Sequence, residues 1–186
     1  MTAMITELTT DRLLLRQWRD DDLDAWAAMN ADPEVREFFP EVLTREQADA
    51  SLGWFRTDLA ERGWGWWAIE VTATGEFIGM AGIDPVDEGV PFHGVEVGWR
   101  LARGAWGHGY ATEAAGAVVR YGFEKLELRE ILAIAAAGNV RSHAVMRRIG
   151  MTRDPADDFD DPTVPAGPLR ASVLYRIRNP HLFTAG

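Results

Sequence analysis

Three glycines, Gly104, Gly107 and Gly109, come just before a run with good helix-forming character from Tyr110 to about Lys125. Because glycine has no Cβ, several backbone N–H groups can converge in such a turn. The helix that follows adds the unpaired N–H groups and the positive dipole end of its first turn. Residues of this type and spacing predict a site that binds phosphate through the backbone. A structural glycine turn before an ordinary capped helix has the same spacing and is the alternative.

The composition fits one globular domain, which we take to span residues 1–186, with a core at about 9–177 and a tail at 178–186. Cysteine is absent, which excludes disulfides, thiolate nucleophiles and cysteine-based metal sites. The four histidines lie far apart and lack the spacing of metal ligands, so no metal site is expected.

The formal net charge of -10 and the pI of about 4.8 argue against general nucleic-acid binding, which needs a basic surface. The same acidity is compatible with a cationic partner such as an amine, and it is also common in proteins that are simply soluble. The sequence has no basic-then-apolar leader and no apolar run of the roughly 18 residues that a membrane span needs. We therefore expect a cytoplasmic protein that binds neither nucleic acid nor membrane. The sequence gives no indication of its oligomeric state.

Hydrophobic periodicity and turn signals predict the element order β-α-α-β-β-β-α-β-α-β. Strands are expected in the second half of 5–18 and at 66–71, 76–83, 95–101, 129–136 and 171–177. Helices are expected from the aspartates at 20–22 to about residue 30, and at 44–63, 110–125 and 139–149, with a further short helical segment at 32–40 that this rough order does not count. Thr44 to Gln47 matches a capping box, and Gly150 is the expected C-terminal stop of the last helix. The segments 85–93 and 154–168 are predicted to be polar loops.

Four segments resemble, in the right order, the GCN5-related N-acetyltransferase (GNAT) superfamily and within it the RimJ/RimL-type ribosomal-protein N-terminal acetyltransferases. They are Leu-Thr-Thr-Asp-Arg-Leu-Leu-Leu-Arg (8–16), Gly-Trp-Arg-Leu (98–101), Ala-Trp-Gly-His-Gly-Tyr-Ala-Thr-Glu-Ala (105–114), and Asn-Val-Arg-Ser (139–142) continuing to Arg-Arg-Ile-Gly-Met (147–151). The resemblance extends from about Thr9 to Ile177, about nine-tenths of the chain. It implies a single-domain α/β fold whose mixed, mostly antiparallel sheet of about seven strands is flanked by helices.

The resemblance also implies an acetyl-CoA-dependent N-acetyltransferase that needs no metal. Acetyl-CoA, the acyl donor, would lie in a V-shaped opening between the strands at 95–101 and 131–136. The implied acceptor is a primary amine, with the N-terminal α-amine of a peptide or protein as the leading class. A small-molecule amine such as an amino sugar, polyamine or antibiotic is the alternative, and a CoA-binding sensor module without catalysis is another.

Carried onto this chain, the resemblance implies a donor site made of Trp99, Leu101, Gly104, Ala105, Trp106, Gly107, His108, Gly109, Ala111, Thr112, Asn139 and Ser142. The pyrophosphate motif of the superfamily begins with Arg or Gln, but that position falls on Gly104 here, with Arg103 one residue early. We therefore expect the N–H groups of residues 104–109 to bind the pyrophosphate, and Thr112 to hydrogen-bond a phosphate oxygen. His108 stands where relatives often carry Lys or Arg and would add a partial charge.

Ser142 is one of two catalytic candidates. Many superfamily members place a tyrosine four residues after this position to protonate the leaving thiolate, but Met146 stands there and its thioether has no proton to donate. The resemblance to the ribosomal branch assigns the role to Ser142, with Asn139 close to the pantetheine arm. The alternative for Ser142 is a serine that hydrogen-bonds the backbone at the helix start.

Glu96 is the second catalytic candidate, as the base that takes the proton of the amine. Because side chains alternate along a strand, it faces away from Val95 and Val97 and shares a side with Gly98 and Arg100. Partial burial would raise its pKa toward the range of a base. A water relay, a solvated glutamate and an ion pair with Arg100 are the alternatives.

The acceptor pocket is the part that the sequence defines least. Glu34 and Glu37 lie in the segment that usually walls it, although each can equally be a solvated charge. The acidic loop 154–168 either contacts a cationic acceptor or is disordered. From the implied fold, a backbone N–H at 97–99 is expected to polarise the thioester carbonyl.

Overall fold

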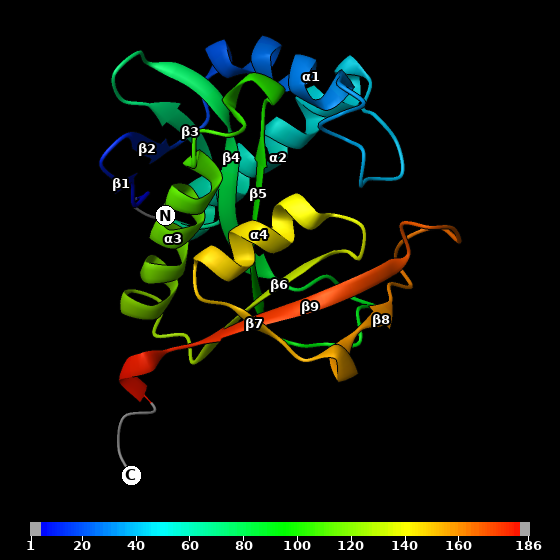
Figure 1. Cartoon of the computed structure of the whole chain (residues 1–186). Helices are drawn as coiled ribbons and strands as arrows, with labels where there is room; N and C mark the ends of the chain where they lie inside the picture. The colour runs from blue at the N-terminus through cyan, green and yellow to red at the C-terminus, as the bar shows by residue number, and fades with distance from the viewer. Residues whose placement is uncertain (1–4, 183–186) are drawn as a thin grey trace.

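The computed structural model describes residues 5–182, and its centre is a nine-stranded sheet (Figure 1). The strands are β1 (Leu8–Thr9), β2 (Leu13–Arg16), β3 (Trp66–Val71), β4 (Glu76–Pro85), β5 (Val95–Leu101), β6 (Glu130–Ala136), β7 (Thr152–Arg153), β8 (Phe159–Asp160) and β9 (Ala171–Arg178). Their order is β1-β2-β3-β4-β5-β6-β9-β7, with β8 also on β9. The neighbours are antiparallel except β5 and β6, which run parallel. The mixed, mostly antiparallel sheet is confirmed, and its strand count exceeds seven because three strands have only two residues each.

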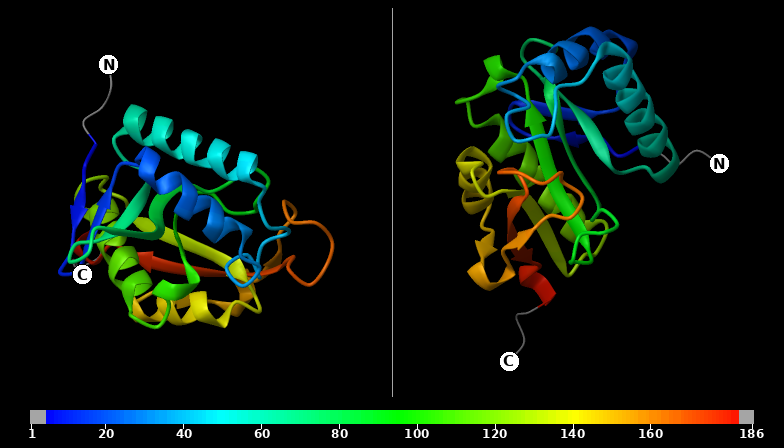
Figure 2. Two further views of the ribbon diagram at one scale, coloured as in Figure 1. Left: turned by 90° about the horizontal axis from the view of Figure 1, so that it is seen from above. Right: turned by 90° about the vertical axis from the view of Figure 1, so that its right-hand side faces the viewer.

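Four helices cover the sheet from both sides. They are α1 (Leu23–Ala31), α2 (Arg45–Arg62), α3 (Tyr110–Glu124) and α4 (Val140–Arg148). Figure 2 shows α1 and α2 on one face of the sheet and α3 and α4 on the other. The side chains of Trp26 and Trp67 are fully buried between these layers. One α/β domain results, with helices on two sides as the resemblance implied.

The capping box predicted before α2 is present. The hydroxyl of Thr44 accepts a hydrogen bond from the N–H of Gln47, and the Gln47 side chain accepts one from the N–H of Thr44. The helix ends at Gly63, whose φ of 79° is left-handed and closes the last turn with a bond to the carbonyl of Leu59. Gly150, the predicted stop of α4, also has a positive φ of 88°.

The helical segment predicted at 32–40 was wrong, because this stretch forms turns rather than a helix. Asp32 precedes a proline, which disfavours helical backbone, and its ψ is 117°. Its carboxylate accepts the N–H of Glu34 at 2.8 Å, which favours a turn. The only backbone bonds of the turn type within this segment are Arg36 N–H to Asp32 at 3.0 Å and Phe39 N–H to Arg36 at 2.9 Å. The segment is therefore a loop between α1 and α2.

Two C-terminal expectations need correction. The loop at 154–168 is not without structure, because it contains a 3-10 turn at Pro155–Asp157 and the strand β8. The expected tail at 178–186 begins inside the sheet, since Arg178 ends β9 and a further 3-10 turn follows at Pro180–Leu182. Residues 183–186 of that tail lie outside the described residues.

Candidate active site

The central feature of the site is the place where β5 and β6 separate. In the described chain a single register pair joins them, Glu96 with Leu132. Beyond it the strands diverge, and a cleft of about 1330 Å³ is lined by residues 96–101 on one side and 134–136 on the other. This is the V-shaped opening expected between 95–101 and 131–136, and Glu96 lies at its narrow end.

The glycine corner occupies the wide end of the cleft, at the start of α3. Gly107 and Gly109 have φ of 83° and 82°, in the left-handed region that favours glycine. Gly109 is the N-cap residue, and no side chain caps the helix, so the N–H groups of its first turn face outward unpaired by the helix itself. The N–H groups of Ala105 and Trp106 are already bonded to the carbonyls of Ala102 and Arg103. The backbone cradle is therefore narrower than predicted and centres on residues 107–112.

Ten of the twelve residues predicted to bind the donor line the cleft: Trp99, Leu101, Ala105, Trp106, Gly107, Gly109, Ala111, Thr112, Asn139 and Ser142. Gly104 and His108 are not among the residues that line it. Gly104 lies in an exposed 3-10 turn, and the His108 ring stacks on Tyr110 with 5.5 Å between centroids. The His108 ring, which was expected to add a partial charge to the cleft, therefore packs on a neighbouring ring and does not line the cleft.

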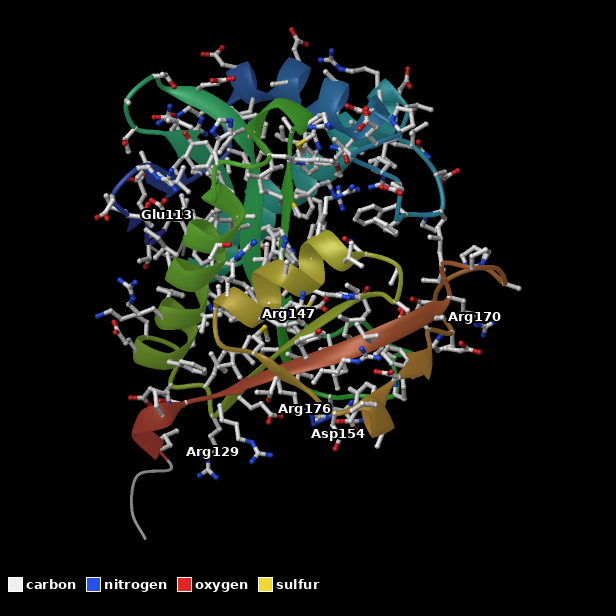
Figure 3. The ribbon with its side chains drawn as sticks, in the orientation of Figure 1. Glu113, Arg129, Arg147, Asp154, Arg170 and Arg176 are labelled. Carbon is white, nitrogen blue, oxygen red and sulfur yellow. The ribbon has the colours of Figure 1, made fainter. Side chains whose placement is uncertain are left out.

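The N-terminal hairpin is attached to this corner through Glu113. This carboxylate, in the first turn of α3, accepts hydrogen bonds from the Thr10 hydroxyl at 2.6 Å and from Arg12 Nε at 2.7 Å. Arg12 also donates to the carbonyl of His108 at 3.0 Å and lines the cleft. Figure 3 labels Glu113 on the side of α3 that faces β1 and β2. The sequence showed Arg12 and Glu113 in two separate motifs, and nothing local indicated that they form a pair.

Asn139 and Ser142 meet at the start of α4, as predicted. The side-chain oxygen of Asn139 accepts the N–H of Ser142 at 3.1 Å, which caps the helix. The Ser142 hydroxyl makes no hydrogen bond to any described residue and lines the cleft, so the alternative of a serine bonded to backbone is not observed. Met146, one turn further, is buried in the cleft wall.

Glu96 is half-buried and shares its face of β5 with Gly98 and Arg100. Burial, together with the negative charges of Asp87, Asp84 and Asp161, raises the pKa of its carboxyl to about 7. The predicted rise is confirmed. The alternative ion pair with Arg100 does not form, because the Arg100 guanidinium donates to Asn30 instead.

The three aspartates around Glu96 were missed at the sequence level. Asp84 is directly opposite Glu96 in the antiparallel pairing of β4 and β5, so the hairpin register could have revealed it. Its carboxylate also accepts Arg62 Nη2 at 2.7 Å. Asp87 is on the following loop, and Asp161 is a buried residue after β8 that lines the cleft. Asp161 belongs to the loop whose contact with the acceptor the sequence left open.

The loop between α1 and α2 forms the outer wall of the cleft. Glu34 pairs with Arg103 at 2.9 Å, and Glu37 pairs with Arg141 at the start of α4. Both glutamates are exposed charges held in surface ion pairs, and Glu34 also lines the cleft. No group of side chains in residues 5–182 has the arrangement of a metal site. In the same part of the chain, none of the helices combines the length and the apolar character of a membrane span.

Comparison with known proteins assigns this architecture to a family. The family model described as acetyltransferase (GNAT) domain matches residues 12–152. The chain belongs to the GNAT acetyltransferase family. GNAT-fold acetyltransferases are acyltransferases that use acetyl-CoA as the donor.

Several known proteins are similar to this GNAT acetyltransferase. The uncharacterized N-acetyltransferase YnaD of Bacillus subtilis (strain 168) is 32% identical over 148 residues, 79% of this chain and 83% of YnaD. The FsC-acetyl coenzyme A-N(2)-transacetylase of Aspergillus fumigatus is 31% identical over 180 residues, 91% of this chain and 75% of the relative. An acetyltransferase of Agrobacterium tumefaciens str. C58 superposes with a TM-score of 0.76 at 30% identity, covering 96% of this chain and 97% of that structure. The ribosomal L7/L12 alpha-N-protein acetyltransferase RimL, solved with coenzyme A, shares the fold with a TM-score of 0.72 at 16% identity, covering 93% and 98%.

Proposed function

We propose that this GNAT acetyltransferase transfers an acetyl group from acetyl-CoA to the N-terminal α-amine of a peptide or protein. The observation that carries the proposal is Glu96, a carboxylate with a pKa of about 7 at the narrow end of the cleft. A base of this pKa suits an α-amine, whose own pKa is about 8, better than a lysine amine near 10.4. The resemblance of the four sequence motifs to the ribosomal-protein branch supports the same acceptor class.

The proposed reaction is direct attack without a covalent enzyme intermediate. The amine nitrogen bonds to the thioester carbonyl carbon, the C–S bond breaks, and the Glu96 carboxylate takes the amine proton directly or through one water. Ser142 protonates the leaving thiolate and regains its proton from solvent. In an antiparallel ladder alternate residues point their N–H groups away from the partner strand. On β5 such groups point toward the diverged β6, where one at residues 97–99 can polarise the carbonyl.

The donor site of the proposal uses the cradle at 107–112 for the pyrophosphate and Asn139 beside the pantetheine arm. The cleft volume of about 1330 Å³ exceeds the roughly 300–1,000 Å³ of pockets for a single small ligand, which leaves room for a donor arm and an acceptor together. Proximity of the two reactants then supplies much of the rate enhancement.

One relative favours a second candidate function, acetylation of a small-molecule amine. The Aspergillus fumigatus protein, 31% identical, is named FsC-acetyl coenzyme A-N(2)-transacetylase, and that name mentions neither a ribosomal protein nor a peptide N-terminus. A third hypothesis is a CoA-binding module without catalysis. It rests on Met146, which has no proton to donate, in place of the family tyrosine. The Ser142 hydroxyl, unbonded to the described residues at the cleft wall, argues against it.

A thiol-release assay with DTNB separates these functions. The acceptors are peptides with a free N-terminus, the same peptides Nα-blocked but carrying an internal lysine, and a panel of small amines. We expect CoA release with free N-termini and none with the blocked peptides. Turnover confined to small amines would replace the peptide assignment. Binding of CoA by calorimetry without turnover of any amine would establish the non-catalytic module.

A further inference from the structure

The guanidinium group of Arg100 lines the cleft, and no described carboxylate pairs with it. It forms no ion pair with any of the described residues, and its Nε atom is buried without a hydrogen-bond partner among them. One donor, Nη1, reaches the side-chain oxygen of Asn30 at 2.8 Å. The guanidinium carbon otherwise lies 4.2 Å from the centroid of the Phe39 ring. A guanidinium has five N–H donors, so most of the capacity of Arg100 is unused.

A second arginine increases the positive charge at this point. Arg36 is 9% exposed, and its guanidinium carbon also lies 4.2 Å from the Phe39 centroid. Its Nε donates to the backbone carbonyl of Glu41, and it too has no ion pair with a described residue. Burial lowers the pKa of Arg100 and the charge of Arg36 lowers it further, which shows that the cation is uncompensated. An arginine nevertheless stays protonated at neutral pH.

Two other arginines, one buried and one half-buried, have carboxylate partners. Arg16, which is 2% exposed, bonds both oxygens of Asp22 at 2.8 and 2.9 Å and a Glu70 oxygen at 2.6 Å. Arg62 is likewise held between Asp58 and Asp84. Because an unpaired charge is costly where water is largely excluded, Arg100 and its neighbour Arg36, which lack a carboxylate partner among the described residues, require a reason. An anion that arrives with a ligand would supply the missing partner.

Arg100 lies on the side of the cleft where the acceptor is expected, opposite the side of the donor phosphates. Glu96, Gly98 and Arg100 share one face of β5, and a Cβ at Gly98 would lie 2.8 Å from the ring of Trp66. Trp66 in turn contacts Phe55 of α2, so this face looks toward α1 and α2, whereas α3 and the phosphate cradle pack on the other face (Figure 2). The donor phosphates are therefore not the counter-charge.

We propose that Arg100 binds a carboxylate of the acceptor, so that the preferred acceptor is a peptide N-terminus followed within a few residues by aspartate or glutamate. The proposal rests on the proposed function and names the substrate class of that site. Acidic groups surround Glu96 at one end of this face of β5, and unpaired arginines mark the other. Four residues of strand separate the two by roughly 13 Å between Cα atoms, and the arginine side chain shortens that span. Two to four extended peptide residues bridge such a distance.

The first test uses the wild-type protein and C-terminally amidated octapeptides. Each peptide carries glutamate at position 2, 3 or 4, with a glutamine twin. A charge-assisted bond predicts a kcat/KM for at least one glutamate peptide about tenfold or more above its twin, mostly through KM. A tripeptide with a free C-terminal carboxylate, compared with its amide, shows whether a terminal carboxylate serves as well. Equal rates for every acid–amide pair would overturn the proposal and leave the proposed function standing.

The second test asks whether Arg100 carries the preference. In Arg100→Gln the ratio between glutamate and glutamine peptides should fall to about one, while the Kd for CoA stays unchanged. Arg103→Gln is the matched control, because it removes one nearby positive charge from an exposed residue that does not line the cleft. Its peptide ratio should equal that of the wild type. A preference that survives Arg100→Gln would assign it elsewhere and overturn the proposal.

If no peptide is acetylated, small amines test whether Arg100 binds an acceptor carboxylate. In that case the peptide part of the proposed function fails, and amino acids are compared with their amides as acceptors. A preference of about tenfold for the carboxylate, lost in Arg100→Gln, would retain Arg100 as the anion-binding residue for a small acceptor. Equal rates would overturn it. If Arg100→Gln does not fold, as judged by circular dichroism, the wild-type pairs decide on their own.

Discussion

The corner before α3 and the wall around Glu96 line the same cleft but are built from different atoms. The corner consists of backbone N–H groups at 107–112, and the residues that shape it are neighbours in the chain. The wall consists of charged side chains, Glu96, Asp87 and Asp161 among them, from three separate segments. In the proposed function the corner therefore binds its anion with almost any side chains, whereas the wall depends on each of its charges.

This difference indicates which part of the site single substitutions can alter. A cradle of backbone groups and a helix terminus binds a phosphate group that every acetyl-CoA molecule presents. A carboxyl group with a pKa set by burial and by neighbouring aspartates responds to single substitutions, and so does an arginine that lacks a partner. Changes in the wall should therefore alter rate, pH profile and acceptor, and changes in the corner should alter only the affinity for CoA.

The largest effect is expected from Glu96→Gln. The amide cannot accept the amine proton, so kcat/KM should fall about 10²- to 10³-fold while the Kd for CoA stays unchanged. In the wild type the proposed base works only when ionised, so kcat/KM should fall below about pH 7, the pKa of Glu96, while the acceptor α-amine, whose pKa is about 8, adds its own rise at higher pH in both proteins. Steady-state kinetics from pH 5.5 to 8.5 on both proteins would show the rise and its loss.

Glu88→Gln serves as the control for this prediction. Glu88 is an exposed acid on the nearby loop, and its side chain does not line the cleft. The substitution therefore removes one negative charge near the site and leaves the proposed base in place. Its rate and pH profile should match those of the wild type. A Glu96→Gln protein that keeps the wild-type rate above pH 7 would favour the water relay or another base.

A smaller loss is expected from Ser142→Ala. A thiolate with a pKa near 8.5 leaves without much help, so removal of the proton donor should lower kcat only about 10- to 100-fold. The backbone N–H of residue 142 can still donate to the side-chain oxygen of Asn139, so the cap of α4 is kept. Stopped-flow measurement of CoA release gives kcat, and calorimetry checks that CoA still binds. An unchanged kcat would remove Ser142 from the mechanism.

The two halves of the site also differ in how far the sequence predicts them. The cradle and the start of α4 were identified because Gly107, Gly109 and Asn139 act through local backbone geometry. In the wall only Glu96 was identified, because Asp161 and Arg100 become neighbours of Glu96 or Phe39 only through tertiary packing. Asp84 is intermediate, since the hairpin register places it opposite Glu96. The wrong helix at 32–40 has a local cause instead: Pro33 disfavours helical backbone at Asp32, and the Asp32 carboxylate accepts the N–H of Glu34 in a turn.

Gly109→Ala tests the corner itself. The φ of 82° at Gly109 costs a residue with a Cβ about 1–2 kcal/mol, and relief of that strain would tilt the first N–H groups of α3. The Kd for CoA should rise about tenfold, with little change in the acceptor KM or in the pH profile. Gly116→Ala, in the same helix with ordinary φ and no atom within 4 Å of the added Cβ, is the control for calorimetry. A larger effect on the acceptor KM than on CoA would contradict the division of the cleft.

Gly104→Arg restores the side chain with which the pyrophosphate motif of the superfamily begins. Gly104 has ordinary φ and no atom within 4 Å of an added Cβ, so the substitution fits without strain. Because we propose that the backbone binds the phosphates, an exposed cation should lower the Kd for CoA only about threefold, and the gain should vanish at high salt. Calorimetry at two ionic strengths measures both. Weaker CoA binding in the variant would show that position 104 is unsuited to this contact.

The smallest effect is expected from Asp87→Asn, and it bears most directly on how the wall works. Among the charges that raise the pKa of Glu96, Asp87 contributes most, but it is exposed and its field is screened by water. Its removal makes ionisation of Glu96 easier, so the acid limb of kcat/KM should move about half a pH unit lower. The rate at pH 6 then rises while the rate at pH 8 stays the same. A limb that does not move, or moves upward, would mean that burial alone sets the pKa of Glu96 and that the aspartates of the wall serve the acceptor instead.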